Sequence, residues 1–343
     1  MDMLKLTREL CGAMGVSGSE EEASKAALEH LRGLTEQTYL DDFHNVIGIV
    51  RRPREGEKTV LLDAHIDQIG MIVTYIDDEG FLRVANCGGV DRHLVLAQQV
   101  TVFGVKPVTG IVATKPPHLT TAEEVGKAPE IDGILIDVGM TKEEAQKLIP
   151  LGSRVVIDSQ FHGLMGQKIA SRALDDRIGV AAILRALELV RGKQLGCGVT
   201  VLFSAQEETG EQGAKVAGFE LEPDIALSVD VSFAHTPDAS PYKCGKMGQG
   251  VMIGVAPSLS KPVYEKLIFL AKEGQIPYQM EVMGGATGTN ADTLGTLKGG
   301  VATGLLSIPL KYMHTPVEVV DLDDVESVAQ LLAAYLMSFG GEY

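Results

Sequence analysis

Residues 199–210, VTVLFSAQEETG, combine an apolar strand with two adjacent carboxylates. Residues 200–204 are mostly apolar, β-branched or aromatic, which is typical of a buried strand in a mostly parallel sheet. Glu207 and Glu208 follow at its carboxyl end, where open α/β sheets bind their ligands. The alternative is a solvated loop, because most glutamates face solvent. The rest of the chain decides between a site and a loop.

The overall composition narrows the class of protein. The chain has 343 residues, of which 46 are acidic and 30 basic, giving a formal net charge of −16. This length favours two domains, and this charge disfavours nucleic acid and anionic membranes as partners. We find no pattern typical of a signal peptide and no apolar run of ~18 residues that could span a membrane. Four scattered cysteines without CxxC spacing disfavour cysteine metal sites and fit a cytoplasmic protein.

The pattern of elements divides the chain into two domains. Residues 1–68 and 163–343 alternate apolar strands with helical segments, which predicts an α/β catalytic domain with a central mixed, mostly parallel sheet flanked by helices. Residues 69–162 instead show short strands separated by Gly- and Pro-containing turns, which predicts an inserted small β-barrel-like domain. Ser19 with Glu22, and Thr141 with Glu144, have capping-box spacing and predict two helix starts.

The segment DAHID, residues 63–67, follows an apolar run at residues 60–62. Residues two apart in extended chain face the same side, so His65 and Asp67 can point together into one crevice. A histidine that binds a metal is commonly oriented by such a carboxylate. The alternative is an ordinary core histidine. Similarly, Asp175 precedes a predicted helix over 173–191, where it could be either a ligand or a helix cap.

Five potential metal ligands follow predicted strands or open a helix: His65, Asp175, Glu208, Asp230 and His314. Imidazoles and carboxylates without thiolates suit zinc, cobalt or manganese. Five ligands exceed what one tetrahedral catalytic site uses, whereas a carboxylate shared by two ions accounts for the surplus. Several classes of hydrolase, aminopeptidases among them, use such paired ions, roughly 3.5–4 Å apart, to hold a bridging hydroxide and polarise a carbonyl. Glu207 would then remain beside a ligand to move protons.

The sequence lacks the motifs that would indicate other kinds of binding site or enzyme. The Gly-rich segments GKMGQG and GGATGTN match neither a P-loop nor a GxGxxG fingerprint, and no GxSxG nucleophile elbow is present. A glycosidase needs two carboxylates roughly 5–9.5 Å apart across one bond. Glu207 and Glu208 are sequence neighbours that would point apart on extended chain. The metal-dependent hydrolase therefore remains the interpretation that the residues favour.

The motifs in this order resemble those of the tetrahedral (TET) aminopeptidases, the glutamyl and deblocking aminopeptidase family of co-catalytic metallopeptidases. The resemblance covers essentially the whole chain, including the inserted segment. It rests on five motifs: DAHID (63–67), ALDDRIG (173–179), QEETG (206–210), SVDVS (228–232) and MHTPVE (313–318).

This resemblance implies a role for each candidate residue. Two divalent ions, zinc or alternatively cobalt or manganese, would be bridged by Asp175. His65 and Asp230 would complete one ion, and Glu208 and His314 the other. The motif also separates two jobs that the residues alone leave open, with Glu207 as general base and Glu208 as ligand. Asp67 would be the catalytic partner that orients His65.

The resemblance further implies an aminopeptidase that hydrolyses N-terminal residues from short peptides. The inserted domain would mediate dimer contacts and substrate access, and the dimers would form a dodecamer. Two positions depart from the family, because Gln68 replaces a common Glu and Asn290 stands where an Asp is frequent. The stretch around Asn290 lies near the substrate side chain in relatives, so we expect side-chain preference to transfer least. Two alternatives are a related amidohydrolase that acts on acylated substrates and a non-catalytic scaffold.

Overall fold

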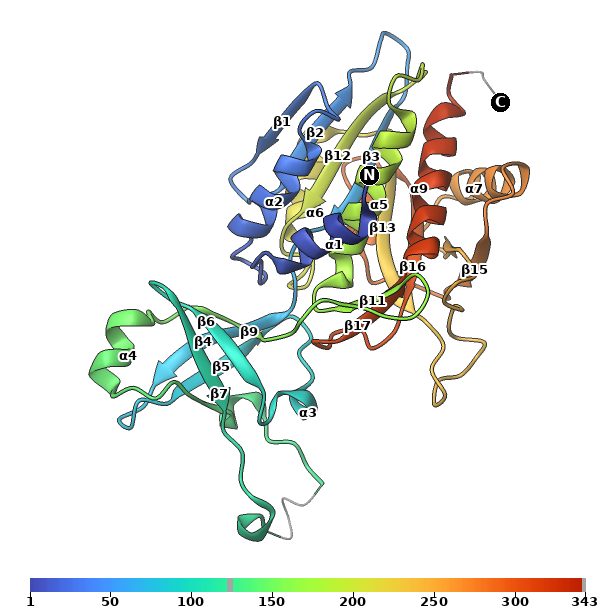
Figure 1. Cartoon of the computed structure of the whole chain (residues 1–343). Coiled ribbons are helices and arrows are strands. Elements are labelled where there is room, and N and C mark those ends of the chain that lie inside the picture. The colour runs from blue at the N-terminus through green and yellow to red at the C-terminus, as the bar shows by residue number, and fades with distance from the viewer. Residues whose placement is uncertain (122–125, 341–343) are drawn as a thin grey trace. The chain divides into compact units, whose positions relative to one another are not determined.

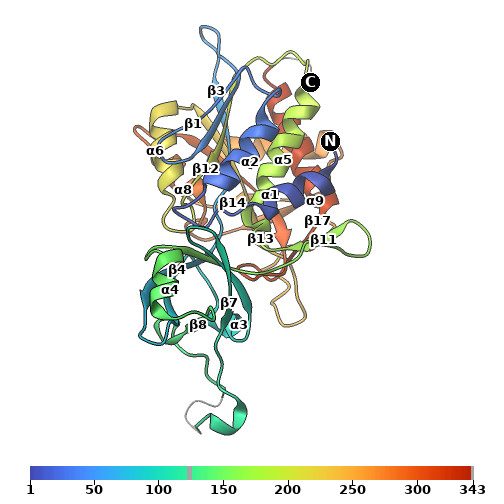
Figure 2. The same ribbon diagram turned by 60° about the vertical axis from the view of Figure 1, so that its left-hand side comes forward.

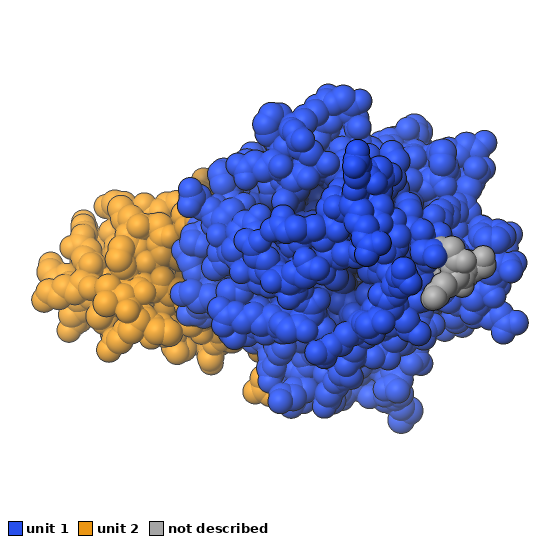
Figure 3. All heavy atoms as spheres, turned by 90° about the horizontal axis from the view of Figure 1, so that it is seen from above, with its two compact units in different colours: residues 1–67, 161–313, 317–343 blue, residues 68–160, 314–316 orange. Residues whose placement is uncertain are grey.

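The computed structural model describes residues 1–121 and 126–340 and divides into two compact units (Figures 1 and 3). The first unit comprises residues 1–67, 161–313 and 317–343, and the second comprises residues 68–160 and 314–316. Across the described residues, no helix has both the length and the apolar character that a membrane crossing requires.

The first unit is built on an eight-stranded sheet in the order β1-β2-β12-β3-β13-β16-β14-β15. The four central strands β12, β3, β13 and β16 are parallel to one another, whereas β1, β2 and the β16–β14 pair add antiparallel contacts. The predicted mixed, mostly parallel sheet is confirmed in this core. The strands are β1 (Gln37–Leu40), β2 (Val46–Arg51), β3 (Thr59–His65), β12 (Gly198–Ser204), β13 (Ile225–Phe233), β14 (Val251–Val255), β15 (Tyr278–Val282) and β16 (Ala302–Leu310).

Helices bury both faces of this sheet, as alternate residues of β3 illustrate. Val60 and Leu62 pack in a cluster with α1, α2, α5, α7 and α9, whereas Leu61 packs in a cluster with α6 and α8. Figures 1 and 2 show α5 and α9 lying side by side in the helix layer that packs on Val60 and Leu62. The helices are α1 (Met3–Gly12), α2 (Glu21–Leu31), α5 (Leu174–Val190), α6 (Gln212–Leu221), α7 (Lys261–Glu273), α8 (Asn290–Gly295) and α9 (Leu322–Met337).

The start of α5 departs from regular helix. Asp175 and Asp176 have non-helical backbone angles and are joined by a cis peptide bond. Asp176 Oδ1 accepts the N–H of Gly179 at 3.2 Å, which is the bond that a helix cap makes. The capping function is therefore served by Asp176, and the Asp175 carboxylate faces His65 instead.

The predicted capping box at Ser19 and Glu22 is wrong. Helix α2 follows Glu20, and no side chain caps it. The buried Glu20 carboxylate instead accepts the N–H groups of Gly18 and of Gln206, which lies in the turn after β12.

The second unit is a closed six-stranded barrel with a core of alternating apolar residues, which confirms the predicted inserted barrel. Thr141 and Glu144 form the predicted capping box at α4. The sequence prediction did not include β8, which has only three residues. The elements are β4 (Gly70–Ile76), β5 (Leu82–Cys87), α3 (Arg92–Val95), β6 (Gln99–Phe103), β7 (Pro107–Val112), η1 (Pro117–Leu119), η2 (Ile131–Gly133), β8 (Leu135–Asp137), α4 (Lys142–Leu148) and β9 (Arg154–Ile157).

A small antiparallel sheet completes the first unit. It consists of β10 (His162–Gly163), β11 (Lys168–Ser171) and β17 (Glu318–Asp321). Two backbone hydrogen bonds between Lys311 and Val319, 2.9 and 3.0 Å long, close the loop from β16 to β17 at its base.

Candidate metal centre

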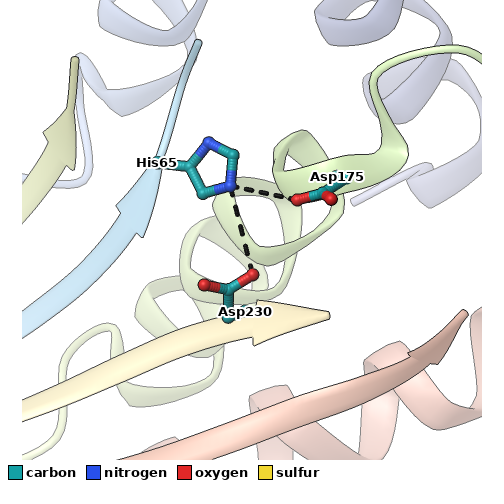
Figure 4. A group of neighbouring side chains, drawn as sticks. All are labelled: His65, Asp175 and Asp230. Carbon is teal, nitrogen blue, oxygen red and sulfur yellow. Dashed lines mark hydrogen bonds and ion pairs between the residues drawn. The ribbon is translucent and has the colours of Figure 1, made fainter. Parts of the chain in front are cut away.

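His65, Asp175 and Asp230 converge in the first unit from three separate elements (Figure 4). His65 ends β3, Asp175 lies in the irregular start of α5, and Asp230 belongs to β13. His65 Nε2 lies 3.0 Å from Asp175 Oδ1 and 4.0 Å from Asp230 Oδ1. All three side chains are buried, and one ligand atom of each lies within 4.8 Å of the others. Four of the five predicted ligands thus lie together in the first unit, because a ligand atom of Glu208 also lies within 4.8 Å of one of Asp175.

The strand register explains why these side chains meet. Strands β3 and β13 pair only as far as Asp63 and Ser228, whereas β13 continues beside β16 to Phe233. Asp230 therefore lies two residues beyond the last β3–β13 pair. The prediction that Asp230 ends its strand is wrong, because pairing with β16 extends β13 by three more residues.

Asp67 connects the histidine to the turn that carries the two glutamates. Its Oδ1 lies 3.4 Å from His65 Nδ1, on the side of the ring opposite the one that faces Asp175. Its two oxygens also accept the backbone N–H groups of Glu207 and Glu208, at 3.0 and 3.2 Å. One buried carboxylate thus contacts the imidazole and fixes the backbone of both glutamates.

Glu207 and Glu208 lie in a tight turn after β12, and both side chains are half-buried. The Glu207 carbonyl accepts the N–H groups of Gly210 and Glu211, which closes the turn. Gln206 enters it with a φ of 56°, in the left-handed region. The turn is therefore neither a continuation of the strand nor a freely solvated loop.

His314 lies in the short segment 314–316 that groups with the second unit. A Cβ atom at Gly89 of that unit would stand 2.6 Å from His314 Nδ1, so the imidazole packs closely against this glycine and would have to shift for a larger residue. Its assignment as a ligand, like that of Glu208, stays a prediction.

The electrostatics of the cluster favour a bound cation. Burial raises the pKa values of Asp230 and Asp176, and it raises the pKa of Glu207 to about 8. Burial opposes protonation of His65, but its contacts with Asp175 and Asp67 outweigh burial and raise its pKa. Raised carboxyl pKa values reflect the cost of burying negative charge, which a divalent cation would offset. Imidazole nitrogen and carboxylate oxygen are donors suited to zinc, cobalt or manganese, so the residues fit such an ion.

Sequence reasoning assigned no role to several residues that support the centre. Glu318 accepts the N–H of Asp175 at 3.1 Å, and Asp176 Oδ2 accepts the N–H of His65 at 3.3 Å. Arg177 is fully buried and donates to the carbonyl oxygens of Ile66 and Leu10. Each of these charged residues lies inside one of the five sequence motifs. A charged residue within a motif is the signal from which its supporting role could have been predicted.

Asn290 belongs to a buried chain of hydrogen bonds that joins α8 to β12 and β3. It is 2% exposed and donates its amide to Ser204 Oγ at 2.8 Å, while Ser204 donates to Asp63 at 2.9 Å. Burial raises the pKa of Asp63 to about 6. An aspartate at position 290 would have no N–H to donate and would add a second carboxyl to this buried chain. Asparagine therefore suits this network.

Comparison with known proteins identifies the family. The family model described as M42 glutamyl aminopeptidase matches residues 45–331. Lysyl aminopeptidase of Pyrococcus furiosus is 32% identical over 340 residues, covering 97% of this chain and 96% of its own. A solved aminopeptidase from the archaeon Desulfurococcus kamchatkensis has a TM-score of 0.91 at 34% identity, covering 98% of this chain and 94% of its own. The TET1 peptidase of Pyrococcus horikoshii has a TM-score of 0.85 at 31% identity, covering 98% of this chain and 99% of its own. The chain therefore belongs to the M42 glutamyl aminopeptidase family, which confirms the resemblance noted in its motifs.

Proposed function

We propose that this M42 aminopeptidase uses two divalent metal ions to release N-terminal residues from short peptides. The observation that carries the proposal is the convergence of His65, Asp175 and Asp230 in one buried cluster. Peptidases of this family depend on metal, and the donor set fits a divalent ion. Zinc is the ion we favour, and cobalt and manganese are alternatives with the same donor preference.

His65 and Asp230 would hold one ion, Glu208 and His314 would hold the other, and Asp175 would contact both. Bound ions would supply Lewis acidity that activates water and polarises the scissile carbonyl. Asp67 would keep the His65 ring oriented, because it lies 3.4 Å from the nitrogen that faces away from Asp175. Asp67 also holds the Glu207 and Glu208 backbone, so it would position base and ligand together.

Glu207 would act as the general base. Its side chain is half-buried beside the cluster, and burial raises its pKa to about 8. In its ionised form the Glu207 carboxylate can accept a proton from the attacking water and return it to the leaving amine, and a raised pKa makes it a stronger base. The acid next to it, Glu208, would bind a metal ion through its carboxylate.

The second unit would mediate dimer contacts and control substrate access, and the dimers would assemble into a dodecamer in the cytoplasm. The similar TET1 peptidase can assemble into a tetrahedron or a large octahedral shell, which supports this part of the proposal. A hollow assembly would select short peptides over folded proteins.

A matched pair of variants tests the division between the two glutamates. We expect Glu207→Gln to lower kcat roughly 10²–10⁴-fold while keeping both ions, because only proton transfer is removed. Glu208→Gln should instead lose one ion together with activity. Aminoacyl anilide turnover and elemental metal content are measured on each, with the exposed Glu265→Gln as control. Near-normal activity of Glu207→Gln would remove the base assignment, and full metal in Glu208→Gln would remove the ligand assignment.

Substrate choice separates the alternatives. Hydrolysis of N-acetylated peptides but not of free aminoacyl anilides would favour an amidohydrolase. Metal content near zero, with activity indifferent to chelators, would favour a scaffold.

A further inference from the structure

Glu281 of β15 is held in place by two serine hydroxyl groups. Ser232 of β13 donates its hydroxyl to Glu281 Oε1, and Ser307 of β16 donates to Oε2 at 2.6 Å. The two serines come from neighbouring parallel strands, and the carboxylate joins them from the edge strand. Both carboxylate oxygens are thus fixed, and each keeps a free lone-pair direction for a further donor.

The register places this carboxylate beside the metal centre. Ser307 is the β16 residue directly paired with Asp230, so the two side chains share one face of the sheet. Ser232 lies two residues beyond Asp230, on that same face and about 6.6 Å further along the strand. A carboxylate that contacts both serines therefore lies next to Asp230, towards the carboxyl end of the parallel strands.

Strand β14 lies between β15 and β16, and it places Met252 beside Ser307 but a glycine beside Glu281. Gly254 pairs with Glu281 across the β14–β15 ladder. Paired residues share a face, and glycine places no side chain there. The Glu281 side chain can therefore pass over Gly254 and reach Ser307 diagonally across β14.

Within the described part of the chain, Glu281 makes its contacts with hydroxyl groups. Among the described residues, no lysine, arginine or histidine forms an ion pair with Glu281, although both oxygens are held by hydroxyl groups. Glu281 is half-buried, so a ligand can still reach it. A half-buried carboxylate with fixed geometry is complemented by a cationic group that brings its own donors.

We propose that Glu281 binds the basic side chain of an N-terminal lysine or arginine and makes this protein selective for basic residues. The inference rests on the proposed aminopeptidase function. When the scissile carbonyl lies at the metal centre, the α-amine is only two bonds away from its carbon. The charged group of lysine stands at the end of a four-carbon stem and can reach a carboxylate further along the sheet. An N-terminal glutamate would be repelled, in contrast to the glutamyl preference in the family's description.

The test compares lysyl, leucyl and glutamyl anilides on the metal-loaded protein. We expect the wild type to prefer lysyl over glutamyl substrate. Glu281→Gln should lower kcat/KM for the lysyl substrate roughly 10- to 100-fold, the effect of losing one charge-assisted hydrogen bond, and for the leucyl substrate much less. Glu281→Lys should invert the preference towards the glutamyl substrate. Glu265→Gln, an exposed carboxylate on α7, is the matched control.

Binding gives a second measurement that does not require turnover. Lysinamide and norleucinamide have side chains of similar length, and only lysinamide carries a side-chain charge. Calorimetry should show tighter binding of lysinamide to the wild type and loss of that difference in Glu281→Gln. A binding preference without turnover would contradict the proposed function and leave this inference intact.

Three outcomes would overturn the assignment of Glu281. The first is a wild type that prefers glutamyl over lysyl substrate. The second is a Glu281→Gln variant with unchanged selectivity. The third is an equal loss on all three substrates, which would indicate that Glu281 binds the α-amine instead.

Discussion

Two pairs of adjacent acidic residues border the centre, and they are organised differently. In the pair at the start of α5, the Asp175 side chain faces the His65 ring, while Asp176 accepts the His65 backbone N–H and caps the helix. In the pair after β12, the backbone N–H groups of Glu207 and Glu208 both bind Asp67. The aspartates are thus separated by what their side chains contact, whereas the glutamates share one backbone anchor.

The difference shows that the backbone conformation can direct the side chains of two neighbouring acids to different contacts. The irregular backbone at the start of α5 points one aspartate towards the centre and buries the other completely. Around Glu207 and Glu208 the structure fixes the backbone, and their separate roles remain the proposal made above. Substitutions in each pair test whether its two acids have separate roles.

The largest effect is expected for Asp175→Ala. If Asp175 contacts both ions, its loss removes metal and activity together, and activity should fall by more than the roughly 10²–10⁴-fold of a proton-transfer residue. Metal content and turnover are measured side by side, with Glu265→Ala as the control. A variant that keeps two ions per chain would contradict the bridging role of Asp175.

A second, smaller effect is expected for Asp176→Ala, on stability. The change removes the acceptor for the N–H groups of His65 and Gly179, which leaves two buried donors unpaired. We expect a loss of about 2–4 kcal/mol in the free energy of unfolding. Asp176→Asn keeps one acceptor oxygen and should recover much of that loss. Urea unfolding measures both, and an Asp176→Ala variant as stable as the wild type would show that Asp176 supports neither bond.

Much of the site was predictable because its residues follow buried strands. Apolar runs before Asp63 and before Gln206 indicated strands whose carboxyl ends meet at one edge, as in parallel sheets. The alternation of short strands and turns in residues 69–162 similarly indicated a barrel. Local pattern was sufficient in these segments because strands buried on both faces leave a continuous apolar run, whereas barrel strands buried on one face leave an alternating one.

Other parts depend on pairing between distant segments. Asp230 lies inside β13 only because β16 extends the ladder to Phe233. Glu281 and Ser232 are 49 positions apart, and their contact follows from β14 pairing with both β15 and β16. Periodicity along one strand carries no information on which neighbour it acquires.

The smallest expected effect concerns Glu20, which anchors the glutamate turn from the N-terminal segment. Its Oε1 accepts the N–H groups of Gly18 at 2.6 Å and Gln206 at 3.3 Å, and Glu20 is fully buried. Burial, with the charge of Asp67, raises its pKa from 4.5 to about 7. The folded state therefore binds the proton more tightly than the unfolded state, so this group lowers stability as pH rises from about 4.5 to about 7.

Glu20→Gln keeps an acceptor oxygen and removes the buried charge. At about pH 8 it should be more stable than the wild type by on the order of 1–3 kcal/mol, and at about pH 4 the difference should vanish. Glu20→Ala loses the acceptor as well and should not be stabilised in this way. Urea unfolding at the two pH values measures each variant. Equal stability of Glu20→Gln and wild type at both values would mean that Glu20 carries no buried charge under the turn.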